Sequence, residues 1–246
     1  MEKAYKLLAN AKNLSHKHAK NLIDRGLVLA NGQKIPLART LLSAKSTFVI
    51  QELRAPSILL YDENLLAIDK PAFVESYELL SWALTHTNIK DLALLHRLDK
   101  DTSGALLFVR EGSEFAKKAR LEFKNRRVYK EYRALVSGII AESRTINKPI
   151  STKKGKSAKS KIDKNGLEAI SHIEPLGIIG KKTLLKVVIE TGRTHQIRIH
   201  LHSLSHPIVG DSLYGGISAP RLMLHAYKIG LLGYDIIANP PKELDL

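Results

Sequence analysis

The 246-residue sequence contains no cysteine and only 24 acidic residues. Without cysteine the protein can form neither disulfides nor thiolate metal sites, and thiolate catalysis is excluded. This composition fits a reducing compartment. No apolar run approaches the roughly 20 residues that a membrane-spanning helix needs. The N-terminus, MEKAYKLLANAKN, also lacks the apolar core of a signal peptide. We therefore expect a cytoplasmic protein that does not bind membranes.

Three common kinds of catalytic site are also missing. The sequence has no Gly-x-Ser-x-Gly turn of the serine hydrolases and no Walker phosphate loop. Four histidines lie within residues 190–216, but their spacing matches no standard ligand pattern, and neither a carboxylate nor a cysteine stands among them. We expect no metal site. A metal-dependent nuclease is disfavoured as well, because it would need an acidic cluster.

The sequence contains many more basic than acidic residues. Lysine and arginine total 39, which gives a formal net charge of +15 and a pI near 9.8. Such a charge points to a polyanionic partner, most often nucleic acid. The apolar share of 44% is ordinary for a globular protein and argues against disorder. The composition therefore predicts a folded protein that binds nucleic acid.

Residues 1–53 predict a compact unit of helices followed by strands. Apolar side chains recur at helical spacing over residues 2–12. A second helix is expected to begin at the N-cap Ser15 and to end before a glycine stop. The pair Asn31-Gly32 then predicts a hairpin turn between two strand-like runs.

The second expected helix has one basic face, with Lys17, Lys20 and Arg25. That face is either solvated surface or a contact surface for RNA phosphates. The helix-helix-hairpin order is similar to the small RNA-binding domain named for the fourth protein of the small ribosomal subunit. Residues 54–57, RAPS, predict a linker to a larger unit that spans residues 58–246.

The larger unit combines strand-like and helix-like segments. Strands are expected at ILLYDENLLAIDKP, GALLFVR, VYKEYRALV and TLLKVVIE, and helices at YELLSWALTHT and over residues 113–127. Residues 194–204 are expected to form a helix capped by Thr194, although strand alternation fits their apolar residues too. The lysine-rich stretch 144–161 predicts a loop that contributes solubility or contacts phosphates.

Charged residues crowd the start of one apolar strand, in HRLDKDTSG. Because unpaired buried charge is costly, this turn is either a solvated connection or a functional site. A catalytic pair made of Asp99 and Asp101 is disfavoured, since alternate residues of a turn usually point apart.

Five ordered blocks resemble the RluA-type pseudouridine synthases from about Ile58 to Ile229. They are ILLYDENLLAIDKP, HRLDKDTSGALLFV, KEYRALV, TGRTHQIRIHL with HPIVGDSLYG, and RLMLHAYKI. The sequence departs from the family after its Lys-Pro pair. There the family usually continues with a glycine-containing loop and a histidine, whereas this chain has AFVESYELL.

The resemblance implies an α+β fold with a curved, mixed, mostly antiparallel sheet and flanking helices, joined to a small N-terminal α/β RNA-binding domain. It also implies isomerisation of uridine in RNA to pseudouridine, in large-subunit ribosomal RNA by family precedent, with transfer RNA as the alternative. No cofactor is expected, because the reaction involves no redox change and loses no group. We expect a monomer. The competing hypothesis is a non-catalytic RNA-binding protein or chaperone that retains the fold.

The same resemblance implies roles for individual residues. Asp99 would be the catalytic residue, Tyr132 would pack against the target base, and Arg198 would pair with Asp99. An arginine beside a carboxylate counters its desolvation and aims its oxygen. The target uridine must leave its stack, and Arg97 is suited to fill the vacated space. Further RNA contacts are expected from His96, Lys70, Arg193 and His195, and from Lys17, Lys20 and Arg25.

Overall fold

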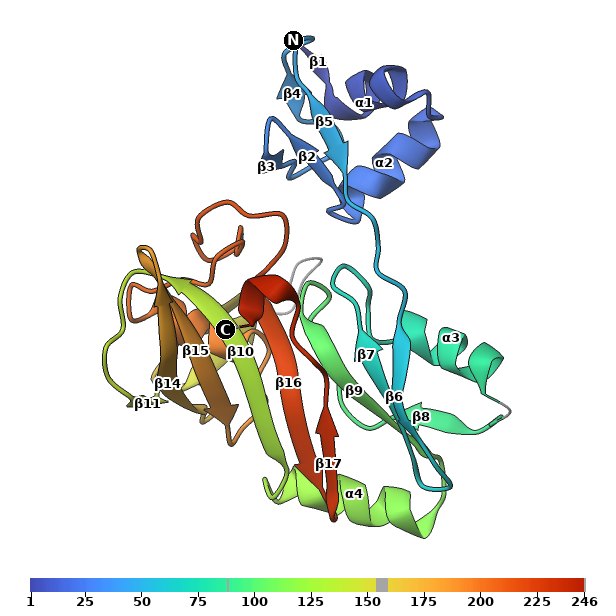
Figure 1. The fold of residues 1–246 in the computed structure, drawn as a ribbon, viewed down its shortest axis with the longest axis vertical. Helices are drawn as coiled ribbons and strands as arrows, with labels where there is room; N and C mark the ends of the chain where they lie inside the picture. Colours follow the sequence, from blue (N-terminus) through green and yellow to red (C-terminus); the bar gives the residue numbers. More distant parts are fainter. Residues whose placement is uncertain (88, 154–158, 246) are drawn as a thin grey trace.

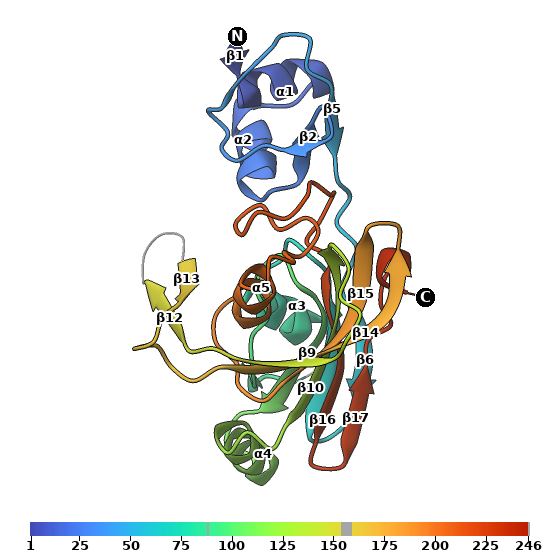
Figure 2. The same ribbon diagram turned by 90° about the vertical axis from the view of Figure 1, so that its left-hand side faces the viewer.

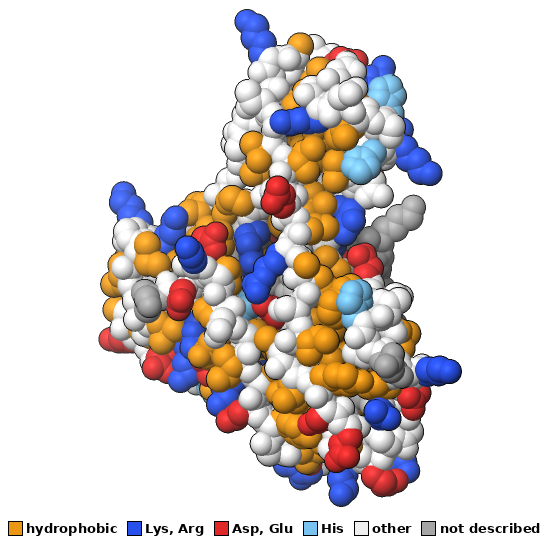
Figure 3. Space-filling model, turned by 45° about the vertical axis from the view of Figure 1, so that its right-hand side comes forward, with side chains coloured by type: hydrophobic (Ala, Val, Ile, Leu, Met, Phe, Trp, Pro, Cys, Tyr) orange, Lys and Arg blue, Asp and Glu red, His pale blue; other side chains and the backbone are white. Residues whose placement is uncertain are grey.

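The computed structural model describes residues 1–87, 89–153 and 159–245. In this part of the chain a small N-terminal unit rests on a larger unit built around one sheet (Figures 1 and 3). Helices α3 (Glu78–His86) and α5 (Gln196–His202) lie on the same side of that sheet (Figure 2), and α4 (Glu114–Lys124) lies at one end of it.

The large sheet has ten strands among the described residues. Their order is β11–β14–β15–β10–β16–β9–β7–β6, with β8 beside β9 and β17 beside β16. Only β9 and β16 pair in parallel among the described strand pairs. The predicted α+β fold with a mixed, mostly antiparallel sheet is therefore confirmed. The bounds are β6 (Ser57–Tyr61), β7 (Leu65–Lys70), β8 (Leu92–Leu94), β9 (Ser103–Arg110), β10 (Tyr129–Ser137), β11 (Arg144–Asn147), β14 (Ile170–Ile179), β15 (Lys182–Ile189), β16 (Leu224–Leu231) and β17 (Tyr234–Ile237), and a short 3-10 helix follows at Lys242–Leu244.

Strands β7 and β9 are apolar on both faces because each face is covered. Leu66, Ile68 and Phe108 pack in a cluster with α3, whereas Leu65 and Leu107 pack in a second cluster with α4. This two-sided burial explains why the sequence shows continuous apolar runs here rather than strict alternation. The helices and strands expected in this region are confirmed.

Helix α5 lies against the other half of the sheet. Its Ile197 and Leu201 pack on Ala134 and Val136 of β10, so the helix is confirmed and the strand alternative is wrong. The expected cap is also wrong: the N-cap is His195, whose φ of 55° is left-handed, and not Thr194. A turn closed by the Gln196 N–H and the Arg193 carbonyl, at 3.0 Å, precedes the helix, and the His195 side chain makes no capping hydrogen bond.

The stretch 144–161 is not the expected loop. It contains β11 in the large sheet and a separate hairpin of β12 (Ile150–Lys153) and β13 (Lys159–Ile162); residues 154–158 lie outside the described residues. Ile146 and Ile150 are buried, and these few apolar positions are too sparse to show a period in the sequence. Ser57, which the sequence placed in the linker, belongs to β6.

The N-terminal unit has its own apolar core, which includes Leu8, Ile23 and Phe48. The Ser15 hydroxyl accepts a hydrogen bond from the backbone N–H of His18 and caps the second helix, as expected. The elements are β1 (Glu2–Lys3), α1 (Ala4–Lys12), α2 (His16–Asp24), β2 (Val28–Ala30), β3 (Gln33–Lys34), β4 (Leu41–Leu42) and β5 (Phe48–Ile50). Asn31 and Gly32, both with positive φ, turn the chain from β2 to β3 as predicted.

The parallel pair brings two backbones unusually close. Gly104 of β9 has a φ of +115°, and a Cβ placed on it would lie 2.2 Å from the carbonyl oxygen of Ala226 in β16. Only glycine allows both this conformation and this approach. Gly104 therefore sets how the loop that precedes β9 meets the middle of the sheet.

We predict that Gly104→Ala lowers the free energy of unfolding by about 3 kcal/mol or more, because it combines backbone strain with overpacking. Gly180→Ala is the matched control. Gly180 also has a positive φ, +60°, but a Cβ placed on it would meet no heavy atom within 4 Å. The control should cost about 1 kcal/mol. Denaturant unfolding of both variants measures the difference, and equal losses would contradict the close approach.

Candidate active site

A cleft of about 1370 Å³ opens on the side of the sheet where α3 and α5 lie. Its walls include the loop 95–102, between β8 and β9, and residues 189–196, before α5. Tyr132 and Leu224 line it from β10 and β16. Pockets for small ligands are usually about 300–1,000 Å³. The cleft therefore has room for a larger ligand.

Asp99 lies in the first wall, and buried side chains hold the backbone on both sides of it. The Ser76 hydroxyl accepts from the N–H of Leu98 and donates to the Leu98 carbonyl, both at 3.0 Å. The ammonium of Lys70 donates to the carbonyl of Lys100, also at 3.0 Å. The position of Asp99 thus depends on the segment that follows β7.

Lys70 is not placed to contact RNA, and that prediction is wrong. Its side chain is 0% exposed, and Nζ also donates to the carbonyls of Pro71, at 2.9 Å, and Val74, at 2.7 Å. Burial lowers the pKa of Lys70 to about 7, against the opposite effect of carboxylates that include Asp101 and Asp99. The residue is a clamp for backbone rather than a surface cation.

Arg198 reaches the cleft from α5 and lies between two carboxylates. Its Nη1 is 3.6 Å from Oδ2 of Asp99. Its Nε and Nη2 donate to the two carboxylate oxygens of Asp211, both at 2.8 Å. The structure thus places Arg198 near Asp99, but the principal partner of the guanidinium is Asp211. This bidentate pair orients the third nitrogen toward Asp99.

Asp211 itself is fixed from several directions. It is fully buried, and its Oδ1 also accepts from the backbone N–H groups of Leu213 and Tyr214. Burial disfavours the charge on Arg198, but hydrogen bonds and the charges of Asp211 and Asp99 outweigh this and raise the Arg198 pKa. The arginine therefore stays charged beside Asp99, whose side chain is 27% exposed.

Tyr132 and His195 complete the surroundings of Asp99. Burial raises the pKa of the Tyr132 phenol and the charge of Asp99 adds to the shift, so the hydroxyl stays protonated. Nε2 of His195 lies 3.9 Å from Asp99 Oδ2, and Nδ1 is 3.0 Å from the hydroxyl of Tyr214. Burial lowers the pKa of His195, against the opposing charge of Asp99.

Three further expected RNA contacts line the same cleft. Arg97 is exposed and lies over the Tyr77 ring, with 5.7 Å between its Cζ and the ring centroid. His96 stacks on Phe123, and burial lowers its pKa to about 4, so it can offer a neutral ring but no positive charge. Arg193 donates from Nε to the carbonyl of Glu168.

Lys17 and Lys20 of α2, and Arg25 directly after it, lie on the N-terminal unit and do not line the cleft. They border a separate open hollow with His16, Asn21 and Asp24. Lys17 and Lys20 are exposed, and Lys20 Nζ lies 4.4 Å from the Tyr5 ring centroid. Arg25 is 3.8 Å from Glu78 of α3, which links it to the larger unit.

Several important residues were not singled out from the sequence. Asp211 was visible in the block HPIVGDSLYG but had no expected role, and Ser76 lay in the divergent AFVES stretch. Lys130 lines the cleft and donates to the Glu190 carbonyl at 3.1 Å. Burial lowers the pKa of Lys130 to about 8, and Arg126 adds to the shift. The buried Gln196 ties the turn before α5 to β14, with Nε2 donating to Ile170 and Ser171.

Three of the four histidines of residues 190–216, namely His195, His200 and His206, have side-chain hydrogen-bond partners. His200 is buried between the Ser171 hydroxyl and the Lys148 carbonyl, and His206 contacts the Ser137 carbonyl. Across the described residues no group of three or more His, Asp or Glu side chains could hold a metal ion. In the same part of the chain, no helix is both long and apolar enough to cross a membrane.

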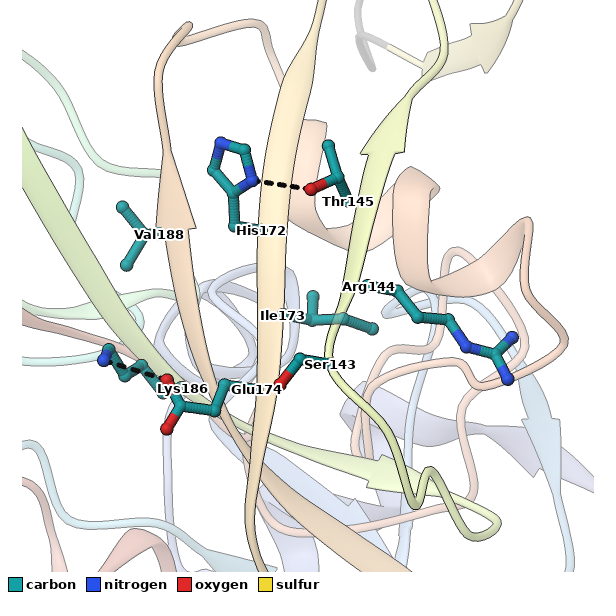
Figure 4. A pocket seen from close by; sticks show the side chains of 8 residues that line it. All are labelled: Ser143, Arg144, Thr145, His172, Ile173, Glu174, Lys186 and Val188. Carbon is teal, nitrogen blue, oxygen red and sulfur yellow. Dashed lines mark hydrogen bonds and ion pairs between the residues drawn. The ribbon is translucent and has the colours of Figure 1, made fainter.

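A second hollow, of about 270 Å³, lies on the opposite face of the sheet (Figure 4). There His172 contacts the Thr145 hydroxyl through Nδ1, at 2.9 Å, and Glu190 through Nε2, at 2.8 Å. The order of hydroxyl, imidazole and carboxylate matches a hydrolase triad. The three side chains are exposed on β11, β14 and the end of β15, as expected for polar cross-strand neighbours. We assign this hollow no catalytic role.

The chain is similar to known proteins in sequence and in fold. Residues 64–203 match the family model described as RNA pseudouridylate synthase. A Helicobacter pylori (strain J99) protein named as an uncharacterized RNA pseudouridine synthase is 56% identical over 248 residues, covering 100% of both chains. A Pseudomonas aeruginosa protein named ribosomal large subunit pseudouridine synthase D is 36% identical over 171 residues, which cover 65% of this chain and 53% of that protein.

A solved structure shows the same fold. Human RNA pseudouridylate synthase domain containing 1 is 30% identical, with a TM-score of 0.64, and the match covers 76% of this chain and 84% of that one. The mixed sheet and its helices thus follow an architecture found in solved relatives.

We predict that Asp211→Asn destabilises the protein by about 3–5 kcal/mol, because it leaves the buried Arg198 charge without its main partner. Asp235→Asn is the control. Asp235 also pairs with a cation, Lys228 at 3.1 Å, but its side chain is 68% exposed. An exposed pair is worth about 0–1 kcal/mol. Denaturant unfolding distinguishes the two, and an Asp211 variant as stable as the control would contradict a structural role for the pair.

Proposed function

The chain belongs to the RNA pseudouridylate synthase family and is an isomerase, and we propose that it converts specific uridines of large-subunit ribosomal RNA to pseudouridine with Asp99 as the catalytic residue. The main support is the geometry around Asp99: a partly exposed carboxylate in a large cleft, 3.6 Å from an arginine that another carboxylate holds in place. The sequence block HRLD, which ends at Asp99, supports the same assignment through its resemblance to the family motif.

The reaction needs one reactive carboxylate and no oxidant or reductant. The bond between the ribose carbon C1′ and N1 of uracil breaks, the base turns, and C1′ bonds to C5. The C5 hydrogen leaves as a proton and N1 takes up a proton, so the product is an isomer of the substrate. Asp99 acts at C1′ as a nucleophile or on the substrate as a base. The Arg198 guanidinium lies beside this carboxylate, and its pair with Asp211 orients it before substrate arrives.

The surrounding groups suit an extruded base. A uridine that leaves its stack costs a few kcal/mol, which contacts in the pocket must offset. Tyr132 offers a protonated aromatic face beside Asp99, and His195 offers a mostly neutral ring. Arg97, exposed beside Tyr77 at the cleft, can occupy the space that the uridine vacates or hold a phosphate.

The choice of RNA rests on two observations. The Pseudomonas aeruginosa relative is named for the large ribosomal subunit, although this chain spans about half of its length. The N-terminal unit has the helix-helix-hairpin order of the small RNA-binding domain described above and exposes Lys17 and Lys20 on α2. We propose that this unit binds structured RNA near the modified site.

We predict that Asp99→Asn lowers pseudouridine formation by at least about 100- to 10,000-fold while RNA binding and folding persist, because the change removes the charge and keeps the size. The comparison variant Asp101→Asn, in the same turn, should lose far less activity. Pseudouridine mapping of ribosomal and transfer RNA, from cells that lack the protein and are resupplied with each variant, tests this. An active Asp99 variant would falsify the catalytic assignment, and sites confined to transfer RNA would overturn the substrate.

We also predict that Lys17→Gln and Lys20→Gln weaken RNA binding and flatten its dependence on salt. Each lost phosphate contact should reduce the slope of log affinity against log salt by about 0.7–0.9. Lys45→Gln is the control, because Lys45 is equally exposed on the same unit but lies outside α2. Binding of a ribosomal RNA fragment across a salt series measures the slope. Equal slopes for all variants would argue against an RNA role for α2.

A further inference from the structure

We propose that the N-terminal unit docks on the catalytic unit in one fixed orientation, and that Lys34 and Phe73 are positioning residues that connect this docking to the Asp99 loop. The catalytic half of the proposal rests on the proposed function; the docking half does not. The N-terminal unit would then help to arrange the active site as well as to hold RNA.

The two units share a small apolar contact. Leu27 and Leu22 of the N-terminal unit pack against Ala72 and Phe73, which follow β7 in the larger unit. Leu27 is only 2% exposed and Phe73 only 6%, so these side chains are covered in the docked arrangement. Separation of the units would return them to water, which opposes undocking.

Phe73 is held in a conformation that few bulky residues adopt. Its φ is +68°, in the left-handed region. Such strain persists only where surrounding contacts fix the residue. The contacts here come from the N-terminal unit: Leu27 in the apolar cluster and the Lys34 ammonium, 5.3 Å from the Phe73 ring centroid.

Lys34 also reaches the loop of the catalytic aspartate. Its Nζ lies 3.6 Å from Oδ2 of Asp101, and both side chains are about a quarter exposed. Asp101 is two residues beyond Asp99, and a turn closes between the Thr102 N–H and the Asp99 carbonyl at 3.0 Å. One lysine of the N-terminal unit therefore contacts both Phe73 and the Asp99 turn.

Lys70 also joins the segment around Phe73 to the Asp99 turn. Its ammonium donates to the carbonyls of Pro71 and Val74, which lie before and after Phe73 in the chain. It also donates to the carbonyl of Lys100, the residue after Asp99. Any movement of Phe73 that displaces Val74 changes this clamp. Docking thus acts on the Asp99 loop by two routes, through Asp101 directly and through Lys70.

Contacts around the apolar cluster define the orientation of the unit. The linker residue Arg54 pairs with the buried Asp69 at 3.0 Å. Gln51 donates to the Pro220 carbonyl at 2.6 Å, and the Ser218 hydroxyl lies 3.4 Å from the Gly32 carbonyl. Figure 2 shows the segment that follows α5 reaching toward the N-terminal unit. These contacts involve segments other than those of the apolar cluster, so they restrict rotation as well as separation.

The segment that follows β7 supplies the docking surface on the larger unit. Ala72 and Phe73 of this segment form the apolar half of the contact.

The docking is testable without any substrate. Because the chain has no cysteine, a Lys12→Cys, Lys118→Cys double variant can receive one spin label on each unit, both at exposed positions. We expect a single narrow distance distribution. Phe73→Asn, which tolerates the left-handed backbone but removes the ring, should broaden it. Leu37→Asn, at an exposed apolar residue of the N-terminal unit, should leave it narrow.

The effect on catalysis is measured by tritium release from C5 of uridine in ribosomal RNA isolated from cells lacking the protein. At saturating RNA, Lys34→Glu and Asp101→Lys should each slow release at least about tenfold, because small displacements of a catalytic group are costly. The charge-swapped double variant should recover most of the rate. A tether that only raises RNA affinity would change KM and leave the saturated rate unaltered.

Each outcome decides one part of the proposal. A broad distance distribution in the parent, or a narrow one in Phe73→Asn, overturns the docking. The positioning role is overturned if a variant with a broadened distance distribution keeps a normal rate at saturating RNA. It is also overturned if the charge-swapped double variant does not recover the rate that Lys34→Glu and Asp101→Lys lose. A parent that releases no tritium overturns the proposed function, and the distance distributions still decide the docking.

Discussion

The arrangement of the site depends most on the hydrogen bonds of the buried Lys70 ammonium. It is enclosed by protein and donates to three backbone carbonyls, from Pro71, Val74 and Lys100. A buried cation without such partners would be strongly unfavourable, so the two backbone segments must keep their spacing for the fold to be stable. Because Lys100 follows Asp99 directly, the same requirement positions Asp99.

The two carboxylates near Arg198, those of Asp211 and Asp99, have different environments and are therefore suited to different roles. Asp211 is fully buried and holds the guanidinium through two hydrogen bonds, whereas Asp99 is partly exposed to the cleft and makes a longer contact with the remaining nitrogen. The first arrangement is suited to orientation and the second to reaction. An arginine anchored in advance needs no reorganisation when charge develops on the substrate.

The excess positive charge serves more than one purpose in this molecule. Lys70 is internal and binds backbone, Lys34 lies between the two units, and Lys17 remains exposed on α2. Net charge alone indicates a polyanionic partner but cannot separate these roles. The burial of each lysine distinguishes these roles, because a lysine whose donors all bind backbone carbonyls has none left for a phosphate.

The sequence by itself determined the local elements, since period, caps and turn residues act over a few positions: the β7 and β9 runs, the Ser15 cap and the Asn31-Gly32 turn all follow from it. It also identified the family and drew attention to Asp99 and Arg198. Only the tertiary structure decided that Asp211 holds Arg198, that Lys70 is buried, and that residues 144–147 form a strand of the large sheet. Those outcomes depend on contacts between distant segments, as between Lys70 and Lys100, and local patterns contain no information about which segments meet.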